Sequence, residues 1–493
     1  MTNTSRRTFF KTAALGAVGA AATVTGAAAA AETKEAAAEY DLIILGAGCA
    51  GLTCAVRAKE DGLKPLLLEK MPSPAGNTIY AAGFMLGINT SFKKGLDLPA
   101  DSKEAFLEDW MKVSQGKAVK ELAKTVVDNC DETLEWLHSF CGVNFKAGFK
   151  LVYPMLSRAH LVVGEHKPGG GQLAVTLMDK AKALGVEMRF STKAVRLLSD
   201  PKTGAVCGVT AKTKNGLEDI RSKYGVVFAT GGFSANQAMV TQYIGSGGAK
   251  MPIRGSRVIA GENILLTAPF LPKVVNVDQY HCGPIYGPTG ANPLNIVNNG
   301  VCVNGKGERF VDEGRTYVEM SRVVAAETPT NWAYMVCDSV AHENKQLAND
   351  WNSYKRLNAP VYEGQTLEEA AKKAGLPADK VAATVAAFNK AVKENSRGKL
   401  TPPNTLPKAN PVEKAPFYIV PFQGGMTATF GGPLINTSGQ VVDTENRPIE
   451  GLFAIGNAAG GLFYDNYIGG AQLTSGAVFG RIVADFVKAK KAA

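Results

Sequence analysis

The stretch that decides the fold runs from residue 40 to residue 69 and reads YDLIILGAGCAGLTCAVRAKEDGLKPLLLE. It predicts, in order, a buried strand over residues 40–45, a G-x-G-x-x-G turn at Gly46, Gly48 and Gly51, a helix over about 52–61, a second strand over 65–68 and an acid at Glu69. Such glycines permit a tight turn and let a pyrophosphate approach a helix N-terminus, and the acid accepts hydrogen bonds from ribose hydroxyls. The pattern predicts an α/β fold with a Rossmann-like dinucleotide-binding domain.

Three later segments favour FAD over a nicotinamide dinucleotide. Residues 76–83 form a small-residue stretch soon after the acid, which leaves room for a large ring system. The chain then returns to the site twice, through strands with glycine turns at 226–232 and 451–457, and a final helix follows that is expected to end near Ala484. The N-terminus of that helix is suited to face a flavin carbonyl. The residues expected to hold FAD, without a covalent bond, are Gly46, Gly48, Gly51, Glu69, Lys70, Asn77, Thr78, Ala82, Gly83, Ala229, Thr230, Gly231, Asn457, Gln472 and Leu473.

The composition is that of an ordinary globular protein. The chain has 493 residues, of which 45% are hydrophobic and 20% charged, so mainly disordered, collagen-like and disulfide-scaffold classes are excluded. The formal charge of +10 indicates a mildly basic surface that favours solubility. No basic stripe with interleaved aromatic residues occurs, so nucleic-acid binding is not expected. No grouping of histidine, cysteine and carboxylate residues has metal-ligand spacing, so no metal is expected.

The first 31 residues have the pattern of an export signal. The segment Ser5-Arg6-Arg7-Thr8-Phe9-Phe10-Lys11 precedes a weakly apolar run rich in alanine and glycine, with small-residue cleavage options near residues 27–29. The paired arginines and the low hydrophobicity point to twin-arginine export. An uncleaved tether or a chance arginine pair is the alternative. We expect a mature protein in the periplasm or otherwise outside the cytoplasm, with no stable membrane span after cleavage.

Nearly the whole mature chain resembles the flavoprotein family of soluble fumarate reductases and succinate dehydrogenase flavoprotein subunits. That family also contains urocanate reductase and the 3-ketosteroid dehydrogenases. The matching stretches are Gly46–Gly51 with Glu69, Gly76–Gly83, Ala229–Phe233, Asn304–Glu313 and Gly451–Arg481. The resemblance implies FAD and a glutathione-reductase-type FAD-binding domain interrupted by a mobile α+β capping domain. It also implies chemistry at a carbon–carbon double bond next to an electron-withdrawing group.

The resemblance divides the chain that follows the signal into three stretches. Residues 39–278 and 425–493 are expected to form the two parts of the FAD-binding domain, and residues 279–424 the capping and substrate domain. Within the cap, two helices are predicted, one opened by the capping-box residue Thr366 and one over residues 378–392.

The resemblance also assigns site residues, one position at a time. The fumarate reductases grip two carboxylates with arginines and histidines, and one arginine supplies the proton. The proton-donor position falls on Tyr317, eight residues after Arg309 of the R-F-V-[DN]-E motif, and the position of a carboxylate-clamping arginine falls on Tyr467. A clamping histidine falls near Thr427, whereas His281 does match a substrate-side histidine. The acid and the arginine that relay protons in fumarate reductases are absent.

The dicarboxylate clamp is therefore mostly missing, which disfavours fumarate as the preferred substrate. Replacing arginine by tyrosine exchanges a bidentate cation for a single phenolic donor. A phenol suits a neutral carbonyl, because it donates a hydrogen bond to an enone oxygen or a proton to carbon. The catalytic candidates are Tyr317, Tyr467 and His281, although the two tyrosines could also only line a pocket wall.

Five further residues near these positions have open roles. Arg254 and Arg257 could bind a carboxylate or only face solvent. Arg315 and Glu319 flank the proton-donor position and could relay protons. His166 matches a flavin-side loop of the family, where a structural role is equally expected.

These observations together predict an exported FAD-dependent reductase that acts on an alkene conjugated to a carbonyl or carboxyl group. The flavin would deliver a hydride, Tyr317 a proton, and Tyr467 with His281 would hold the activating oxygen. No C-x-x-C-H haem motif and no second nucleotide fold occur, so we expect a separate electron donor, either a cytochrome c or a membrane quinol dehydrogenase.

Three alternatives stay open at this point. The first is a 3-ketosteroid-type dehydrogenase that desaturates a ketone ring, because the sequence does not fix the direction of the reaction. The second is a fumarate reductase. The third is a flavin electron carrier without a substrate of its own, although the large predicted cap argues against a carrier, which needs an exposed flavin edge.

Overall fold

The computed structural model describes residues 39–74, 76–151, 153–165 and 169–493. The predicted export signal and His166 lie outside the described residues. Within those four ranges no helix is both long and apolar enough to cross a bilayer.

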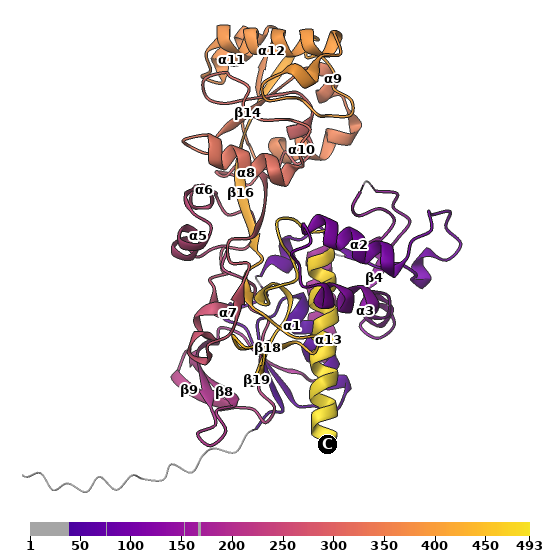
Figure 1. Ribbon diagram of the computed structural model, residues 1–493, viewed down its shortest axis with the longest axis vertical. Coiled ribbons are helices and arrows are strands. Elements are labelled where there is room, and N and C mark those ends of the chain that lie inside the picture. The colour runs from indigo at the N-terminus through magenta and orange to yellow at the C-terminus, as the bar shows by residue number, and fades with distance from the viewer. Residues whose placement is uncertain (1–38, 75, 152, 166–168) are drawn as a thin grey trace, which may run out of the picture. The chain divides into compact units, whose positions relative to one another are not determined.

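A six-stranded sheet lies at the centre of the predicted FAD-binding domain (Figure 1). Its order is β18-β19-β10-β1-β2-β6, and every neighbouring pair is parallel except β18 with β19. Both β1 and β2 are buried along their whole length, which is why they read as unbroken apolar runs in the sequence. The strands are β1 (Leu42–Leu45), β2 (Pro65–Leu68), β6 (Glu187–Arg189), β10 (Val226–Phe228), β18 (Gln440–Val442) and β19 (Pro448–Ala454).

Helices α1 (Cys49–Glu60) and α13 (Ala471–Ala492) pack closely against each other (Figure 1). The contact depends on small residues: a Cβ added at Gly480 would lie 2.8 Å from a backbone oxygen of α1. The predicted end of the last helix, near residue 484, is too early, because α13 continues to residue 492. Val487 is buried in this extension, so the apolar face of the helix continues past the predicted end.

Two three-stranded antiparallel sheets and several helices complete this part of the chain. The sheets have the orders β7-β8-β9 and β3-β5-β4. The elements are β3 (Phe84–Leu86), β4 (Asn144–Lys146), β5 (Ala159–Val163), β7 (Lys193–Ser199), β8 (Val206–Thr213), β9 (Gly216–Arg221), β11 (Val274–Val275), β17 (Gly432–Pro433), α2 (Lys103–Val113), α3 (Lys120–Ser139), α4 (Gly170–Ala183), α5 (Gln237–Tyr243), α6 (Ser246–Ala249) and α7 (Glu262–Leu265).

A second sheet, of order β12-β16-β14-β13, carries the predicted cap. Its strand β16 (Phe417–Thr429) is long: the first residues pair with β14 and β15 and the last with β12 (Figure 1). Residue 424 lies inside β16, and the predicted domain boundaries stay a prediction. The remaining elements are β12 (Tyr280–Ile285), β13 (Val301–Val303), β14 (Ala333–Cys337), β15 (Tyr362–Gly364), α8 (Tyr317–Glu327), α9 (Ser339–His342), α10 (Ala348–Arg356), α11 (Leu367–Lys373) and α12 (Ala378–Lys393).

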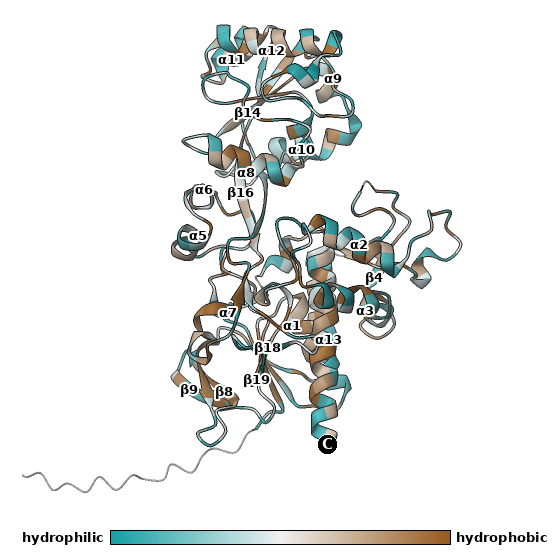
Figure 2. Cartoon of the chain, in the orientation of Figure 1, coloured by the Kyte–Doolittle hydropathy of each residue, from teal (hydrophilic) through white to brown (hydrophobic). Residues whose placement is uncertain are grey.

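The two sheets have separate apolar cores. The largest cluster surrounds the central sheet with α1 and α13, and two further clusters lie within the second sheet and its helices. Figure 2 shows the corresponding brown residues on the central strands and teal residues along α11 and α12. These helices are the two predicted in the cap, and the Thr366 side chain caps α11 by accepting from the Glu369 N–H at 3.1 Å.

Candidate active site

A cavity of about 640 Å³ lies where β1, β2, β10 and β19 end. Open α/β sheets bind ligands at the carboxyl ends of their parallel strands. Every residue expected to hold FAD lines this cavity, with the single exception of Gly51. The cavity is also lined by Tyr317, Tyr467, His281 and Arg254. One space therefore joins the predicted cofactor residues to the predicted substrate residues.

The glycine turn after β1 is held against the turn after β10. Gly46 has φ +109°, and a Cβ there would lie 2.6 Å from the Ala229 oxygen. A Cβ at Gly51 would lie 2.0 Å from the Gly46 oxygen, so this glycine lets α1 pack on the turn and does not face the cavity. The first helical N–H, that of Cys49, donates to Oγ1 of Thr78 at 2.9 Å. The segment after β2 is thereby fixed to the start of α1.

The acid at the end of β2 lies beside the glycine turn. Glu69 is 7% exposed, and its carboxylate accepts hydrogen bonds at 2.9 Å from the N–H groups of Ala47 and Met71. The next residue, Lys70, places its Nζ 2.6 Å from Oε1 of Glu262. Glu69 therefore has a fixed orientation at the position where the fingerprint expects a ribose acceptor.

Two amide side chains test whether the cavity fits a flavin. Asn457 donates from Nδ2 to Oε1 of Gln472 at 2.9 Å. The other atom of each amide, Oδ1 of Asn457 and Nε2 of Gln472, is buried in the cavity wall and has no hydrogen-bond partner among the described residues. A free acceptor and a free donor side by side are suited to a planar ring with both kinds of polar edge. The residues present therefore fit FAD.

Three rings meet at the other end of the cavity. The His281 imidazole, on β12, is edge-on to the Tyr467 ring with centroids 4.8 Å apart and to the Tyr317 ring at 5.8 Å. Tyr317 is the first residue of α8, where Thr316 and Glu319 form a capping box. Tyr467 comes from the turn that precedes α13. The three predicted catalytic residues thus come together from three separate elements.

Burial keeps all three side chains uncharged. His281 is 3% exposed, and burial, with the charges of Arg254 and Arg322 in support, holds its pKa well below the ordinary value. Burial raises the pKa of Tyr317 and of Tyr467, against the charge of Arg254. At neutral pH the site therefore presents one neutral imidazole and two protonated phenols.

Arg322 connects the elements that carry these rings. From α8 it donates to the backbone oxygen of Tyr280 on β12 at 2.7 Å, and it forms an ion pair with the Asp465 carboxylate. Asp465 has φ +58°, and its N–H donates a hydrogen bond to Oε1 of Gln279 at 2.9 Å. The turn that holds Tyr467 is therefore tied to α8 and β12 by side chains.

Arg254, whose role the sequence leaves open, lines the cavity. It lies on the loop before α7, and its Nη1 donates to Oγ1 of Thr427 at 3.0 Å. The Asn292 amide satisfies both of its polar groups in one orientation. In that orientation the Asn292 oxygen accepts from Nη2 of Arg254 at 3.1 Å, and the Asn292 nitrogen donates to the Pro284 oxygen at 3.0 Å. Arg257 is exposed and does not line the cavity. Thr427 and Asn292 have no sequence signal of their own beyond their proximity to positions that the resemblance assigns.

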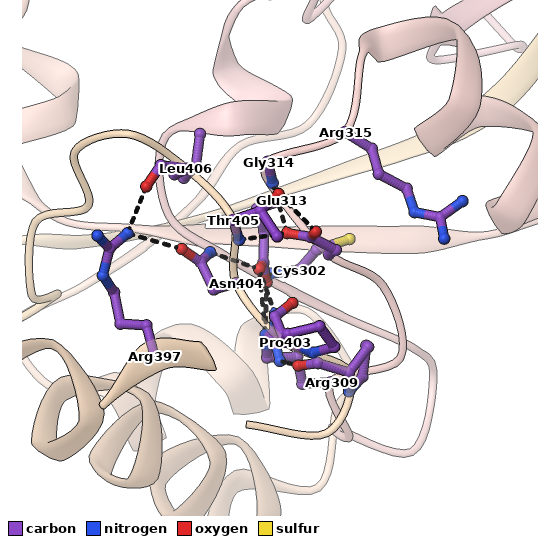
Figure 3. Close-up of polar contacts among 12 residues, drawn as sticks. Cys302, Arg309, Glu313, Gly314, Arg315, Arg397, Pro403, Asn404, Thr405 and Leu406 are labelled. Carbon is purple, nitrogen blue, oxygen red and sulfur yellow. Dashed lines mark hydrogen bonds and ion pairs between the residues drawn. The ribbon is translucent and has the colours of Figure 1, made fainter. Parts of the chain in front are cut away.

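The R-F-V-D-E motif proves to be a buried polar network (Figure 3). Glu313, which is fully buried, accepts from Nε and Nη2 of Arg309 at 2.9 and 2.7 Å. It also accepts from the Cys302 N–H at 3.0 Å and from Nδ2 of Asn404 at 2.9 Å. Arg397 donates to the oxygen of the same Asn404 amide at 3.0 Å. The network joins β13 to the loop near residue 404. The motif itself ends at Glu313, shortly before α8 begins.

The two charged residues that flank Tyr317 lie away from the three rings. Glu319 uses its carboxylate to accept from the N–H and the hydroxyl of Thr316, at 3.0 and 2.7 Å. Arg315 is exposed, and Figure 3 shows its side chain pointing away from the Glu313 network. Neither residue lines the cavity, so the geometry gives no support to a proton relay through them.

Residues 41–473 match the FAD binding domain family. The chain belongs to this family. The fold class, the FAD cofactor and the suspected resemblance are thereby confirmed, and the protein is an FAD-dependent oxidoreductase. Its relatives include a probable fumarate reductase, a urocanate reductase, an NADH:acrylate oxidoreductase and a vinyl phenol reductase.

Three similar proteins each match at least 90% of this chain. The probable fumarate reductase Ifc3 of Shewanella frigidimarina is 27% identical over 450 residues, which cover 90% of this chain and 74% of that protein. An open conformation of a flavocytochrome c3 fumarate reductase has TM-score 0.80 and 26% identity, over 91% of this chain and 78% of the other. The 3-ketosteroid-Δ4-(5α)-dehydrogenase of Rhodococcus jostii RHA1 has TM-score 0.75 and 25% identity, over 93% and 99%.

Proposed function

We propose that this FAD-dependent oxidoreductase reduces a carbon–carbon double bond conjugated to a carbonyl or carboxyl group, with Tyr317 as the proton donor. The observation that carries the proposal is the single cavity that joins the residues for FAD to Tyr317, Tyr467 and His281. The names of the relatives agree with this class of reaction.

The chain's own residues supply the proton and hold the activating group. FAD bound here and reduced by the electron donor would supply a hydride to one carbon of the double bond. The Tyr317 phenol, protonated because burial raises its pKa, gives its proton to the neighbouring carbon. The Tyr467 phenol and the neutral His281 ring donate hydrogen bonds to the activating oxygen, where negative charge builds up in the transition state. Nδ1 of His281 is buried without a partner among the described residues, which leaves one ring position for a ligand.

The reverse reaction is a second candidate, because two observations favour it. Tyrosines occupy both positions at which the resemblance expects arginines for carboxylates, and the chain matches 99% of the length of a solved 3-ketosteroid dehydrogenase. The same phenols, acting in the opposite sense, would then promote loss of a proton next to a ketone. A fumarate reductase is disfavoured on the same ground, because a phenol does not replace a bidentate guanidinium.

Electron supply and export form a separate part of the proposal. A second protein, a cytochrome c or a quinol dehydrogenase, reduces the flavin, because the sequence carries no C-x-x-C-H haem motif. Twin-arginine export rests on Ser5-Arg6-Arg7 and the weakly apolar run that follows. Fractionation of cells that express the full chain tests this: Arg6→Lys with Arg7→Lys should retain the flavoprotein in the cytoplasm, and an unchanged distribution contradicts export by this route.

The reaction is tested in steady state with reduced methyl viologen as the electron source. The panel contains fumarate, urocanate, crotonate, cinnamate, neutral enones and 3-ketosteroids. Oxidation of the dye that depends on an alkene, with the saturated compound as product, supports the proposal. Reduction of an added acceptor by a saturated 3-ketosteroid, without any reaction of the alkenes, supports the reverse reaction. A flavin that transfers electrons between dyes and never reacts with an alkene or a ketone identifies an electron carrier.

A further inference from the structure

The loop that carries Arg254 is fixed to strand β16. The Arg254 N–H donates to the Met426 oxygen at 2.7 Å, and Ile253 forms a parallel bridge with the same residue. The Arg254 side chain packs against two glycines. A Cβ added at Gly283 would lie 2.8 Å from Cζ of Arg254, and a Cβ added at Gly425 would lie 3.2 Å from Cβ of Arg254. The guanidinium therefore lies in a space that only glycines leave open, and it lines the cavity.

The guanidinium has no counter-charge in the described part of the protein. No described carboxylate lies within 4.0 Å of it. Its protein partners are neutral, the hydroxyl of Thr427 and the amide of Asn292, and its Nε is buried without a partner. The carboxylates that line the cavity, Glu69 and Glu262, are both engaged at the cofactor end. A cation enclosed by neutral groups favours an anionic ligand.

The number of available cations limits the charge of that ligand. Lys70 and Lys193 also line the cavity, but both lie close to Glu262, at 2.6 and 3.6 Å. Arg322 is paired with Asp465 and does not line the cavity. The three rings beside Arg254 are uncharged at neutral pH, as described above. The substrate end therefore carries one unpaired positive charge among the residues that the structure describes.

We propose that Arg254 binds the single carboxylate of the substrate, so that the enzyme selects an unsaturated monocarboxylate over a dicarboxylate and over a neutral enone of the same shape. This inference rests on the proposed function and narrows its substrate class. The residue that binds the carboxylate comes from the loop before α7, whereas the positions that the resemblance assigns to clamping and proton-donating arginines hold Tyr467 and Tyr317. A phenol and a neutral imidazole beside the guanidinium can bind the same carboxylate without adding charge.

Ligand binding to the oxidised holoenzyme tests the anion site without turnover. The probes are butanoate and 3-phenylpropanoate, their unsaturated counterparts crotonate and cinnamate, and the methyl ketone that replaces each carboxylate. Binding is followed through the flavin absorbance. The variants are Arg254→Gln, which removes the charge, and Arg254→Lys, which keeps it, with Arg257→Gln as an exposed control on the same loop.

We expect the wild type to bind the acids more tightly than their methyl ketones. Arg254→Gln should weaken binding of the acids at least about 30-fold, a typical cost of removing one partner of a buried charge pair, and should leave the ketones nearly unchanged. Arg254→Lys should recover part of the loss, and Arg257→Gln should behave as the wild type.

Three results would overturn the inference. One is equal weakening of acids and ketones by Arg254→Gln, which indicates a change of cavity shape. Another is a wild-type flavin spectrum that none of the acids perturbs. The third is a shift of the flavin midpoint potential in Arg254→Gln with acid binding unchanged, which assigns the charge to the flavin. If the acids bind through Arg254 and no alkene is reduced, the proposed function fails while the anion site stands.

Discussion

The imidazole of His281 and the phenol ring of Tyr467 meet edge to face, with centroids 4.8 Å apart and planes at 89°. Tyr317 meets the same imidazole at 5.8 Å and also at 89°. One buried, neutral histidine is thus the common neighbour of both phenols. Changes at any of the three residues should alter the catalytic step more than the fold, because the elements that carry them have apolar contacts of their own.

Loss of the Tyr317 hydroxyl should stop proton transfer and leave substrate binding nearly intact. For Tyr317→Phe we expect kcat for alkene reduction to fall by about 10²- to 10⁴-fold, the usual share of a general acid. Steady-state kinetics with reduced methyl viologen measures this. Tyr243→Phe is the matched control, since Tyr243 packs on Phe233 at 5.6 Å and does not line the cavity. An unchanged kcat in Tyr317→Phe assigns the proton to another donor.

The low pKa of His281 has a consequence for the pH profile of activity. Because burial holds this pKa well below the ordinary value of about 6.5, His281 is already neutral across the neutral range. We therefore expect the plot of log kcat/KM against pH to show no inflection near pH 6.5 that can be assigned to His281. The wild type and His281→Gln should have the same profile shape in this range. An inflection near that pH in the wild type, absent from the variant, contradicts a neutral His281.

The same pKa makes the free energy of unfolding depend on pH. Below about pH 6.5 the unfolded chain binds a proton at His281 and the folded protein does not, so this residue lowers stability as the pH falls and has no effect above that range. Urea unfolding between about pH 8 and pH 5 should show a larger loss for the wild type than for His281→Gln. Parallel losses in the two proteins would show that His281 titrates normally when folded.

The amide pair of Asn457 and Gln472 should matter for FAD affinity. Asn457→Leu removes the free acceptor and leaves the Gln472 amide without its partner, so we expect the dissociation constant of FAD to rise at least about tenfold. Fluorescence of FAD released on dilution reports the constant. Gln440→Leu is the control, because it breaks the similar contact with Asn436, at 3.0 Å, away from the cavity. Equal FAD loss in both variants indicates a general loss of stability.

The buried network of the R-F-V-D-E motif should contribute to stability. Glu313→Ala leaves the Arg309 guanidinium, whose side chain is 6% exposed, without its carboxylate, and we expect a loss of about 3–5 kcal/mol in the free energy of unfolding. Lys124→Ala breaks an exposed ion pair with Asp128 and should change that energy by less than about 1 kcal/mol. Urea denaturation measures both, and similar values for the two variants contradict a structural role of Glu313.

Local patterns predicted the dinucleotide half of the fold well. The apolar runs at 42–45 and 65–68 and the glycine turn between them form one continuous β-α-β unit, so their pattern can be recognised within a single segment, although β1 also pairs with the distant β10. The end of α13 could not be predicted in this way, because Val487 is buried in the apolar core around the central sheet, which distant segments also form. The two three-stranded sheets were not predicted, although β7 and β8 have seven and eight residues.

The substrate end shows where sequence reasoning stops. Tyr317, Tyr467 and His281 were found through a resemblance, since nothing in the spacing of these residues alone brings them together. The sequence alone allows Arg254 either to bind a carboxylate or to face solvent, because its position depends on Gly283 and Gly425, which lie on two other strands. A pattern on one segment carries no information about the space that other segments leave open.

The most direct test of the account follows the flavin itself in a single turnover. The holoenzyme is reduced under anaerobic conditions and mixed in a stopped-flow instrument with crotonate, cinnamate, fumarate or a neutral enone. We predict that the rate of flavin reoxidation saturates with alkene concentration and that one saturated product forms per flavin. Reoxidation by a monocarboxylate should be fast in the wild type and slow in Tyr317→Phe. A reduced flavin that none of these alkenes reoxidises, in an enzyme that retains its FAD, would contradict the central claim.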